Sequence, residues 1–270
     1  MAWAGILLWA WVAQGDKLPP FQAGASDVTF EKSSPKGQIE TLKSRFHFKV
    51  EVTPYDIKQE KFRVVVSKSY THEEKWGLFV YVNPGDDAGI PGEYEAVLEK
   101  HHLIAVAAYK TGNERNVVDR FRLALDAQWN MAQRFNLDPA RVYVSGFSGG
   151  GRIASMLGVA YADVFPGSIP FCGVNFYTNI PADPGKVWPS VFTPASDTLR
   201  VAKSTARFVL VTGEKDINLK NTQAVYDLGF KKEGFKHALL MEIPGMGHQT
   251  PPAESFDKGL DFLDKVDKPK

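Results

Sequence analysis

A serine flanked by glycines is the pattern in this chain with the clearest chemical meaning. Residues 146–150 read GFSGG and match G-x-S-x-G, in which the serine occupies a sharp strand-to-helix turn. The positions two before and two after Ser148 must be small, because the strand and helix backbones crowd there. The turn lifts the hydroxyl above the sheet and directs the amide of Gly149 to where an oxyanion would form. The pattern predicts a nucleophilic serine; the alternative is a glycine-rich turn in which Ser148 only caps the helix.

The same letters also match the beginning of a phosphate-binding loop, G-x-x-x-x-G, over residues 146–151. That loop continues with Lys and then Ser or Thr, which contact the phosphates and Mg²⁺. Here Arg152 and Ile153 follow, so both groups are missing. The segment therefore favours a nucleophile over a nucleotide site.

A serine hydroxyl becomes a good nucleophile only when an imidazole accepts its proton. Where a serine occupies such a turn, the chain order is serine, acid, histidine. Downstream of Ser148 there are only two histidines, His237 and His248. His248 follows the last predicted strand at its carboxyl end, whereas His237 precedes that strand. We therefore expect His248 to be the base and His237 to be an ordinary exposed histidine.

The acid that orients the histidine is expected in the loop at 212–216, which reads TGEKD and leaves the preceding strand. Asp216 is favoured because the loop has turned at Gly213, so that an aspartate here can point back over the sheet. Glu214 is the second choice and Asp197 a distant third.

The oxyanion needs two donors. The first is the backbone amide of Gly149. The second is expected after the strand at 77–82, where residues 83–87 read NPGDD. Because Pro84 has no N–H, the amides of Gly85 and Asp86 are the candidates.

These residues need a sheet to position them, and the chain alternates strands with helices over most of its length. Apolar runs and alternation predict strands at 46–52, 61–67, 77–82, 102–108, 141–144, 168–172, 208–211 and 238–243. Helical periodicity predicts helices at 92–100, 117–135, 151–160, 221–231 and 253–266. Such alternation indicates an α/β fold with a mostly parallel central sheet and helices on both faces.

The domain organisation is predicted from breaks in this pattern. Residues 1–15 are apolar and uncharged and are interpreted as a signal peptide, so the protein is expected to be secreted or periplasmic, or cytoplasmic if the segment is not a signal. Residues 16–44 are expected to form an N-terminal linker, and residues 45–270 a single domain. Within it, 175–204 is proline-rich and without clear periodicity, which is typical of a functional insertion or of a surface loop. Four aromatic residues are candidates for substrate binding: Phe147, Tyr177, Trp188 and Phe192.

Composition narrows the function classes. The chain has 270 residues, with 32 Lys and Arg against 31 Asp and Glu, a net charge of +1. This balance argues against a nucleic-acid-binding protein that depends on bulk positive charge. Cys172 is the only cysteine, which excludes an intramolecular disulfide and a multi-cysteine metal site. His101 and His102 would point to opposite sides of a strand and so do not form a metal pair. No stretch is long enough to span a membrane.

The segments at 141–150, 212–216 and 245–248 resemble the α/β-hydrolase superfamily, in particular the esterase branch that contains polyhydroxybutyrate depolymerases and feruloyl esterases. The resemblance extends from about residue 61 to 266 and implies an α/β-hydrolase fold with Ser148, Asp216 and His248 as nucleophile, acid and base. The sequence departs from the family at 83–85, which reads NPG where His-Gly is frequent. It also lacks the disulfides that secreted members often carry.

Together these features predict a serine esterase that cleaves a small or polymeric carboxylic ester through an acyl-enzyme, without metal or cofactor. Two alternatives remain open: a peptidase or other acyl hydrolase with the same chemistry, and a non-catalytic binding protein that keeps the residue pattern. The sequence does not predict the acyl or alcohol group of the substrate or the oligomeric state.

Overall fold

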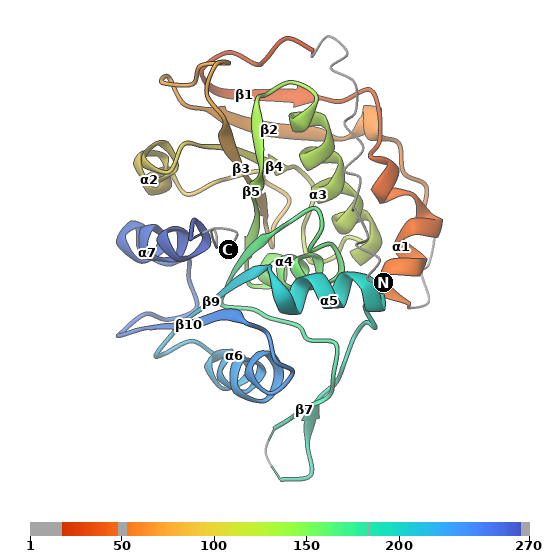
Figure 1. Ribbon diagram of the computed structural model, residues 1–270, viewed down its shortest axis with the longest axis vertical. Coiled ribbons are helices and arrows are strands. Elements are labelled where there is room, and N and C mark those ends of the chain that lie inside the picture. Colours follow the sequence, from red (N-terminus) through yellow and green to blue (C-terminus); the bar gives the residue numbers. More distant parts are fainter. Residues whose placement is uncertain (1–17, 48–52, 183, 266–270) are drawn as a thin grey trace, which may run out of the picture.

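The computed structural model of the protein describes residues 18–47, 53–182 and 184–265. At its centre is an eight-stranded sheet in the order β1-β2-β4-β3-β5-β6-β9-β10, with helices on both faces (Figure 1). Strand β2 is antiparallel to β1 and β4, and the other neighbouring pairs are parallel. The strands are β1 (Gly24–Thr29), β2 (Lys61–Val66), β3 (Trp76–Val82), β4 (Leu103–Ala108), β5 (Leu137–Phe147), β6 (Gly167–Phe171), β9 (Arg207–Gly213) and β10 (His237–Ile243).

Two sets of helices cover the sheet. One face packs against α2 (Glu95–Lys100), which follows the short helix η3 (Gly92–Tyr94), and against α7 (Ala253–Leu263). The other face packs against the remaining helices: α1 (Ile39–Phe46), α3 (Val117–Ala132), α4 (Gly149–Ala160), α5 (Ser196–Ser204), α6 (Leu219–Ala224) and the π-helical η4 (Val225–Lys231). Two short turns, η1 (Pro35–Gly37) and η2 (Ile57–Gln59), lie between the first elements. The predicted mostly parallel sheet between two helical layers is confirmed.

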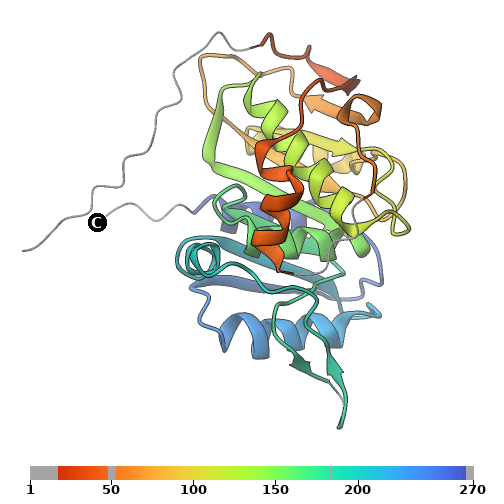
Figure 2. The ribbon, with the colours of Figure 1, turned by 90° about the vertical axis from the view of Figure 1, so that its right-hand side faces the viewer.

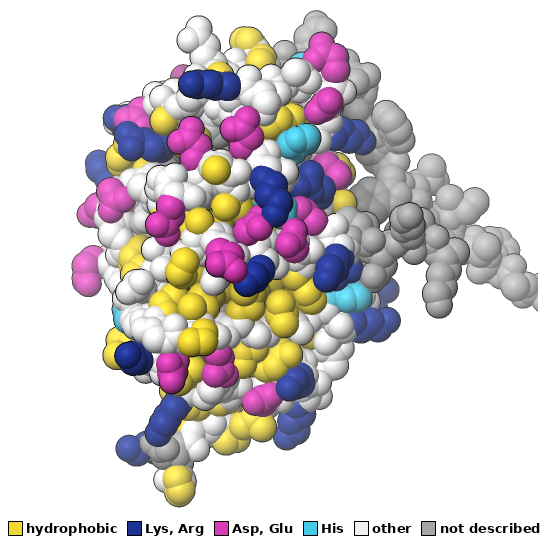
Figure 3. All heavy atoms as spheres, turned by 90° about the vertical axis from the view of Figure 1, so that its left-hand side faces the viewer, with side chains coloured by type: hydrophobic (Ala, Val, Ile, Leu, Met, Phe, Trp, Pro, Cys, Tyr) yellow, Lys and Arg dark blue, Asp and Glu magenta, His cyan; other side chains and the backbone are white. Residues whose placement is uncertain are grey.

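Strands β3 and β4 form the centre of the core, as their continuous apolar sequences predict. Every residue of both is buried. Along β3, Leu78 and Val80 face the α3 and α4 layer, whereas Phe79 and Tyr81 face α2 and α7. On the α2 and α7 side, a band of hydrophobic side chains also reaches the surface (Figure 3).

The segment before the domain is not a linker over its whole length, so this expectation is wrong. Residues 24–29 form β1, which pairs with β2 along its whole length, and α1 follows. The composition of β1, GASDVT, has low strand propensity, and its place comes from pairing at the sheet edge. The predicted strand at 46–52 is also wrong at its start. Phe46 ends α1, because Leu42 and Phe46 lie one helical turn apart and are both buried. Residues 48–52 lie outside the described part.

The insertion at 175–204 contains a hairpin and a helix. Strands β7 (Ile180–Pro181) and β8 (Val187–Trp188) pair antiparallel and project from the body of the molecule (Figure 2). Helix α5 then returns to the core, so the expectation of an aperiodic segment is wrong for residues 196–204. The signal was weak because only Thr198 and Ala202, one turn apart, are buried on it.

The remaining predicted elements are present with shifts of a few residues at their ends. Among the residues that the structure describes, no helix has both the length and the apolar character needed to span a bilayer. The predicted signal peptide at 1–15 lies outside the described residues.

Candidate active site

The predicted sharp turn is present between β5 and α4. Ser148 has φ 54° and ψ −115°, a strained conformation for a residue with a side chain. Its amide donates to the Phe171 carbonyl oxygen at 2.8 Å, which ties the turn to β6. A Cβ on Gly150 would overlap the carbonyl oxygen of Val82, and one on Gly146 would press on the backbone of Gly150. Both glycines are therefore required by the close approach of strand and helix.

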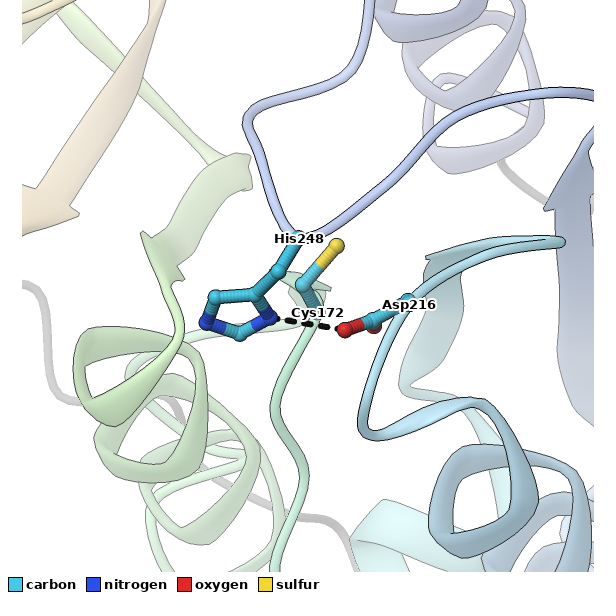
Figure 4. A group of neighbouring side chains, drawn as sticks. All are labelled: Cys172, Asp216 and His248. Atoms are coloured by element: carbon cyan, nitrogen blue, oxygen red, sulfur yellow. Dashed lines mark hydrogen bonds and ion pairs between the residues drawn. The ribbon is translucent and has the colours of Figure 1, made fainter.

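The turn brings Ser148 to two side chains from distant loops. His248 Nε2 lies 3.0 Å from Ser148 Oγ, and His248 Nδ1 lies 2.7 Å from Asp216 Oδ1. The Asp216 side chain has no exposed surface, whereas that of His248 is 26% exposed. His248 comes from the loop after β10 and Asp216 from the loop after β9, and both loops leave the same edge of the sheet. Figure 4 shows His248 and Asp216 pointing toward each other.

Asp216 accepts further hydrogen bonds that keep it ionised. The Asn218 amide donates to Oδ1 at 3.1 Å, and the Thr212 hydroxyl donates to Oδ2 at 2.7 Å. Burial alone would raise the pKa of this carboxyl, but the hydrogen bonds from Asn218, His248 and Thr212 outweigh burial and lower the pKa below its usual value. A fixed negative charge therefore faces the Nδ1 side of the imidazole.

The other titratable candidates lie elsewhere. Glu214 is exposed and accepts from the Gly245 amide at 2.8 Å. Asp197 is in the first turn of α5 and accepts from the amide of Thr198. His237 begins β10 and so lies at the opposite end of that strand from His248. The structure thus brings Asp216, rather than Glu214 or Asp197, to His248.

The first predicted oxyanion donor lies at a helix N-terminus, and its role stays a prediction. Gly149 is the first residue of α4, where backbone amides have no acceptor within the helix. The loop that carries Gly85 and Asp86 is held to the segment after β4. The Lys110 amide donates to the Asp86 carbonyl at 2.8 Å, and the Gly112 amide to its carboxylate at 3.0 Å. The roles of Gly85 and Asp86 as donors stay predictions.

Two residues that the sequence analysis missed lie against this region. The carboxamide of Asn113 occupies the space that a Cβ on Gly149 would take. Arg120 donates to Asn113 Oδ1 at 3.4 Å and to the Asn83 carbonyl at 3.1 Å. Burial lowers the pKa of Arg120 to about 10, and the side chain is 5% exposed. Arg120 is a charged residue within the helix α3, and no local sequence signal points to its role.

Cys172 lies beside the acid and the base (Figure 4). Its thiol donates to the Gln249 carbonyl oxygen at 3.2 Å, and burial raises its pKa to about 12. The ligand atoms of Cys172, Asp216 and His248 lie within 4.8 Å of one another, a spacing that a metal ion would fit. The raised pKa favours the thiol over the thiolate that a metal would need, and His248 Nδ1 is engaged with Asp216, so the present arrangement suits proton transfer.

Of the four aromatic candidates, one contacts His248 and another lines a cavity that Arg152 also lines. The rings of Phe147 and His248 are 4.9 Å apart, and Trp188 lines a cavity next to α4. Phe192 is 3% exposed and packs on Phe46, so it belongs to the core. The hydroxyl of Tyr177 donates to Glu233 at 2.8 Å, and its ring packs in the same core cluster. The expectation of a substrate wall is thus wrong for Phe192, because the insertion folds back onto α1.

Besides Cys172, Asp216 and His248, a second group of side chains with metal-ligand spacing contains His101. The His101 ring lies between two aspartates, one on α7 and one directly after it. His101 Nδ1 lies 2.6 Å from Asp264 and Nε2 lies 2.8 Å from Asp257. His102 instead stacks on Trp76 with 4.8 Å between ring centroids. Both histidines lie in the turn between α2 and β4, so the predicted placement on opposite sides of a strand is wrong, although the two rings do have different partners.

No protein-family model and no curated protein matches the chain. Solved structures do. An S-formylglutathione hydrolase from Staphylococcus aureus is 11% identical with a TM-score of 0.57, and the match covers 92% of this chain and 100% of that one. Esterase 2 of Thermogutta terrifontis, phosphorylated by paraoxon, is 16% identical with a TM-score of 0.53, over 80% and 92%.

A protein from Bacteroides ovatus described as a dipeptidyl aminopeptidase IV is 13% identical with a TM-score of 0.53. The match covers 77% of this chain but only 34% of that protein, so the chain spans about a third of its length. The narrower resemblance to polyhydroxybutyrate depolymerases and feruloyl esterases stays a prediction. The sheet order, the two helical layers and these neighbours together show that the chain has the α/β-hydrolase fold.

Proposed function

We propose that the protein is a serine hydrolase that cleaves carboxylic esters through an acyl-enzyme. The observation that carries this proposal is the continuous hydrogen-bonded series from Ser148 through His248 to Asp216, with the serine on a strained turn. A strained conformation persists at such a position only where the surrounding structure holds it, and reactive residues are a common reason.

In the first half-reaction, Ser148 Oγ attacks the ester carbonyl carbon while His248 Nε2 accepts its proton. Asp216 holds Nδ1–H and stabilises the imidazolium that forms. The negative charge on the carbonyl oxygen is stabilised by the Gly149 amide and by a donor in the Gly85–Asp86 region. The tetrahedral intermediate collapses, and His248 returns the proton to the departing alcohol. Ser148 then carries the acyl group.

In the second half-reaction, a water molecule takes the place of the alcohol. His248 removes its proton as it attacks the acyl carbonyl, and the same donors stabilise the second oxyanion. The carboxylic acid leaves when Ser148 recovers its proton from His248. Every proton moves through one imidazole, whose orientation Asp216 maintains.

The structural neighbours support the ester assignment. Two of them carry the names of an esterase and an S-formylglutathione hydrolase, and the esterase was captured in a form phosphorylated by an organophosphate. The peptidase alternative has support from a neighbour that matches this chain over only a third of its own length. Export through the segment at 1–15 remains part of the proposal.

The test is labelling with a fluorophosphonate probe, followed by mass spectrometry of the modified peptide. We expect the wild type to be labelled at Ser148 and Ser148→Ala to be folded but unlabelled. Ser44→Ala, which removes an exposed hydroxyl on α1, is the matched control and should label normally. Absence of label on the folded wild type would overturn the mechanism and favour a non-catalytic binding protein. Comparing a 4-nitrophenyl ester with a peptide anilide distinguishes esterase from peptidase.

A further inference from the structure

A cavity of about 140 Å³ is lined by Arg152, which lies one helical turn into α4 from Ser148. Three parts of the chain that position the active site contribute to it: the first turn of α4, the segment after β6, and α6. The hairpin β7–β8 and the residues after it close the cavity on its outer side. Its apolar lining comes from Val174, Phe176, Ile180, Trp188, Val191 and Val225. The volume is small beside the 300–1,000 Å³ of typical ligand pockets, so it suits a short chemical group.

One charged side chain lines this cavity. Arg152 lies four residues after Ser148, which is about one helical turn or roughly 5.4 Å along α4. It donates to Asn175 Oδ1 at 3.1 Å and to Asn218 Oδ1 at 3.2 Å. A guanidinium has about five N–H donors, so about three of them are not used by the two hydrogen bonds to Asn175 and Asn218.

The charge of Arg152 has no direct counterion. In the part of the chain that the structure describes, no carboxylate forms an ion pair with it, and the cavity lining contains no acidic residue. Burial lowers the pKa of Arg152, and the charge of Asp216 opposes this effect only in part. The cavity is thus a small, partly apolar space with one incompletely compensated positive charge.

A second polar residue in the lining has a side-chain atom without a partner. Asn221 on α6 is 7% exposed, and its Oδ1 is buried without a hydrogen bond. Buried polar atoms almost always have a partner. The unpaired atom here is an acceptor, which an anion cannot satisfy, so the group of Asn221 that can contact an anion is its N–H₂. The carboxamide of Asn221 can turn to offer either its oxygen or its N–H₂.

We propose that this cavity binds the carboxylate of an anionic ester substrate, with Arg152 and Asn221 as its polar contacts. The proposal rests on the esterase function and names its substrate class: esters in which a short chain of a few carbons separates a free carboxylate from the ester carbonyl. One carboxylate oxygen accepts from Arg152 and the other from the amide of Asn221. The apolar walls of the cavity would contact the methylene groups of that chain.

The experiment compares two substrates with the same leaving group and the same number of acyl carbons: 4-nitrophenyl pentanoate, which is neutral, and the mono-4-nitrophenyl ester of glutaric acid, which is anionic. The readout is the ratio of their kcat/KM values. We expect the wild type to prefer the glutarate ester. In Arg152→Gln the ratio should fall about ten- to hundredfold, as expected for loss of a charge-assisted hydrogen bond.

Using a ratio removes any general effect of Arg152→Gln on the loops that hold Asp216, because both substrates share the catalytic steps. Asn221→Leu should lower the ratio in the same direction by removing the second contact. Arg200→Gln is the matched control, since Arg200 is exposed on α5 and does not line the cavity. It should leave the ratio at the wild-type value.

The outcomes separate this inference from the function on which it rests. If fluorophosphonate does not label Ser148 in the wild type and neither ester is cleaved, the esterase function fails and the inference fails with it. If Ser148 is labelled and pentanoate is cleaved, but the ratio is the same in wild type and Arg152→Gln, the inference alone is overturned. A lower ratio in both Arg152→Gln and Arg200→Gln would overturn it too, because bulk charge would then account for the preference.

Discussion

Replacing Asp216 with asparagine separates two roles of the carboxylate, its charge and its effect on the tautomer of His248. In the structure, Oδ1 accepts from two donors, His248 Nδ1–H and the Asn218 amide, whereas Oδ2 accepts from the Thr212 hydroxyl. An asparagine carboxamide would keep its oxygen at the Oδ1 position, because an N–H₂ there would face two donors. Its N–H₂ would then face Thr212, whose hydroxyl can reverse its role and accept.

The expected size of the effect follows from this orientation. Where an asparagine forces the wrong tautomer of the histidine, the loss in kcat is about 10⁴-fold. Here His248 keeps an acceptor for Nδ1–H, and only the negative charge is lost. An opposite charge in direct contact stabilises a cation by about 10- to 1000-fold. We therefore expect Asp216→Asn to lower kcat by about 10- to 1000-fold, and Asp216→Ala, which removes the acceptor altogether, to lower it further.

The assay is the steady-state hydrolysis of 4-nitrophenyl pentanoate by wild type, Asp216→Asn, Asp216→Ala and Glu214→Gln. Glu214 is the matched control, because it lies in the same loop but accepts only from the exposed Gly245 amide. We expect nearly wild-type kcat for Glu214→Gln. Equal losses of about 10⁴-fold in both Asp216 variants would refute the reasoning on tautomers. A larger loss in Glu214→Gln than in Asp216→Asn would refute the assignment of the acid.

Two further predictions concern stability. Gly150→Ala should lower the free energy of unfolding by about 1–3 kcal/mol or more, because its Cβ would overlap the Val82 carbonyl oxygen. Gly247→Ala, with open space around the added Cβ, should be tolerated. Equal Tm values for the two variants would contradict this prediction. The pKa of His101 is raised from 6.5: burial would lower it, but hydrogen bonds to Asp264 and Asp257 outweigh burial. Because the folded-state pKa exceeds the unfolded one, the stabilisation is complete below about pH 6.5 and is lost as the pH rises through the folded-state pKa. The Tm difference between wild type and His101→Gln should therefore shrink as the pH rises above about 6.5, and a Tm difference that does not change with pH would contradict this.

The parts of the fold that the sequence predicts are those where burial is strong and local. Strands β3 and β4 are buried on both faces, so every residue is apolar and the run is recognisable without its partners. Strand β1 and helix α5 were missed for the opposite reason. Strand β1 is held by its ladder with β2 and by polar contacts of Asp27 with Arg63 and Tyr109, which sequence periodicity does not reveal.

A similar division holds for the active site. Ser148 was predicted from local spacing, and Asp216 and His248 from topology, since both follow parallel strands and must emerge at the same edge of the sheet. Thr212 and Asn218, which hold the acid, and Arg120, which contacts the loop after β3, have no such signature. Each acts through hydrogen bonds to other residues of the folded chain, and a residue type at an ordinary position in a strand, loop or helix does not reveal those contacts.

The residues proposed to carry out the reaction and those proposed to select the substrate come from different segments of the chain. The groups proposed to transfer protons come from loops fixed to the sheet, whereas the apolar outer side of the cavity comes from the insertion between β6 and α5. The hairpin β7–β8 projects from the body (Figure 2), with Ile180 buried in the core and Pro181 and Val187 exposed. Its sequence can therefore change without moving Ser148, His248 or Asp216. Arg152 is different, because it reaches both the cavity and, through Asn218, the loop of the acid. A substitution there affects selection of the substrate and the orientation of the acid together, and only a ratio of two substrates separates these effects.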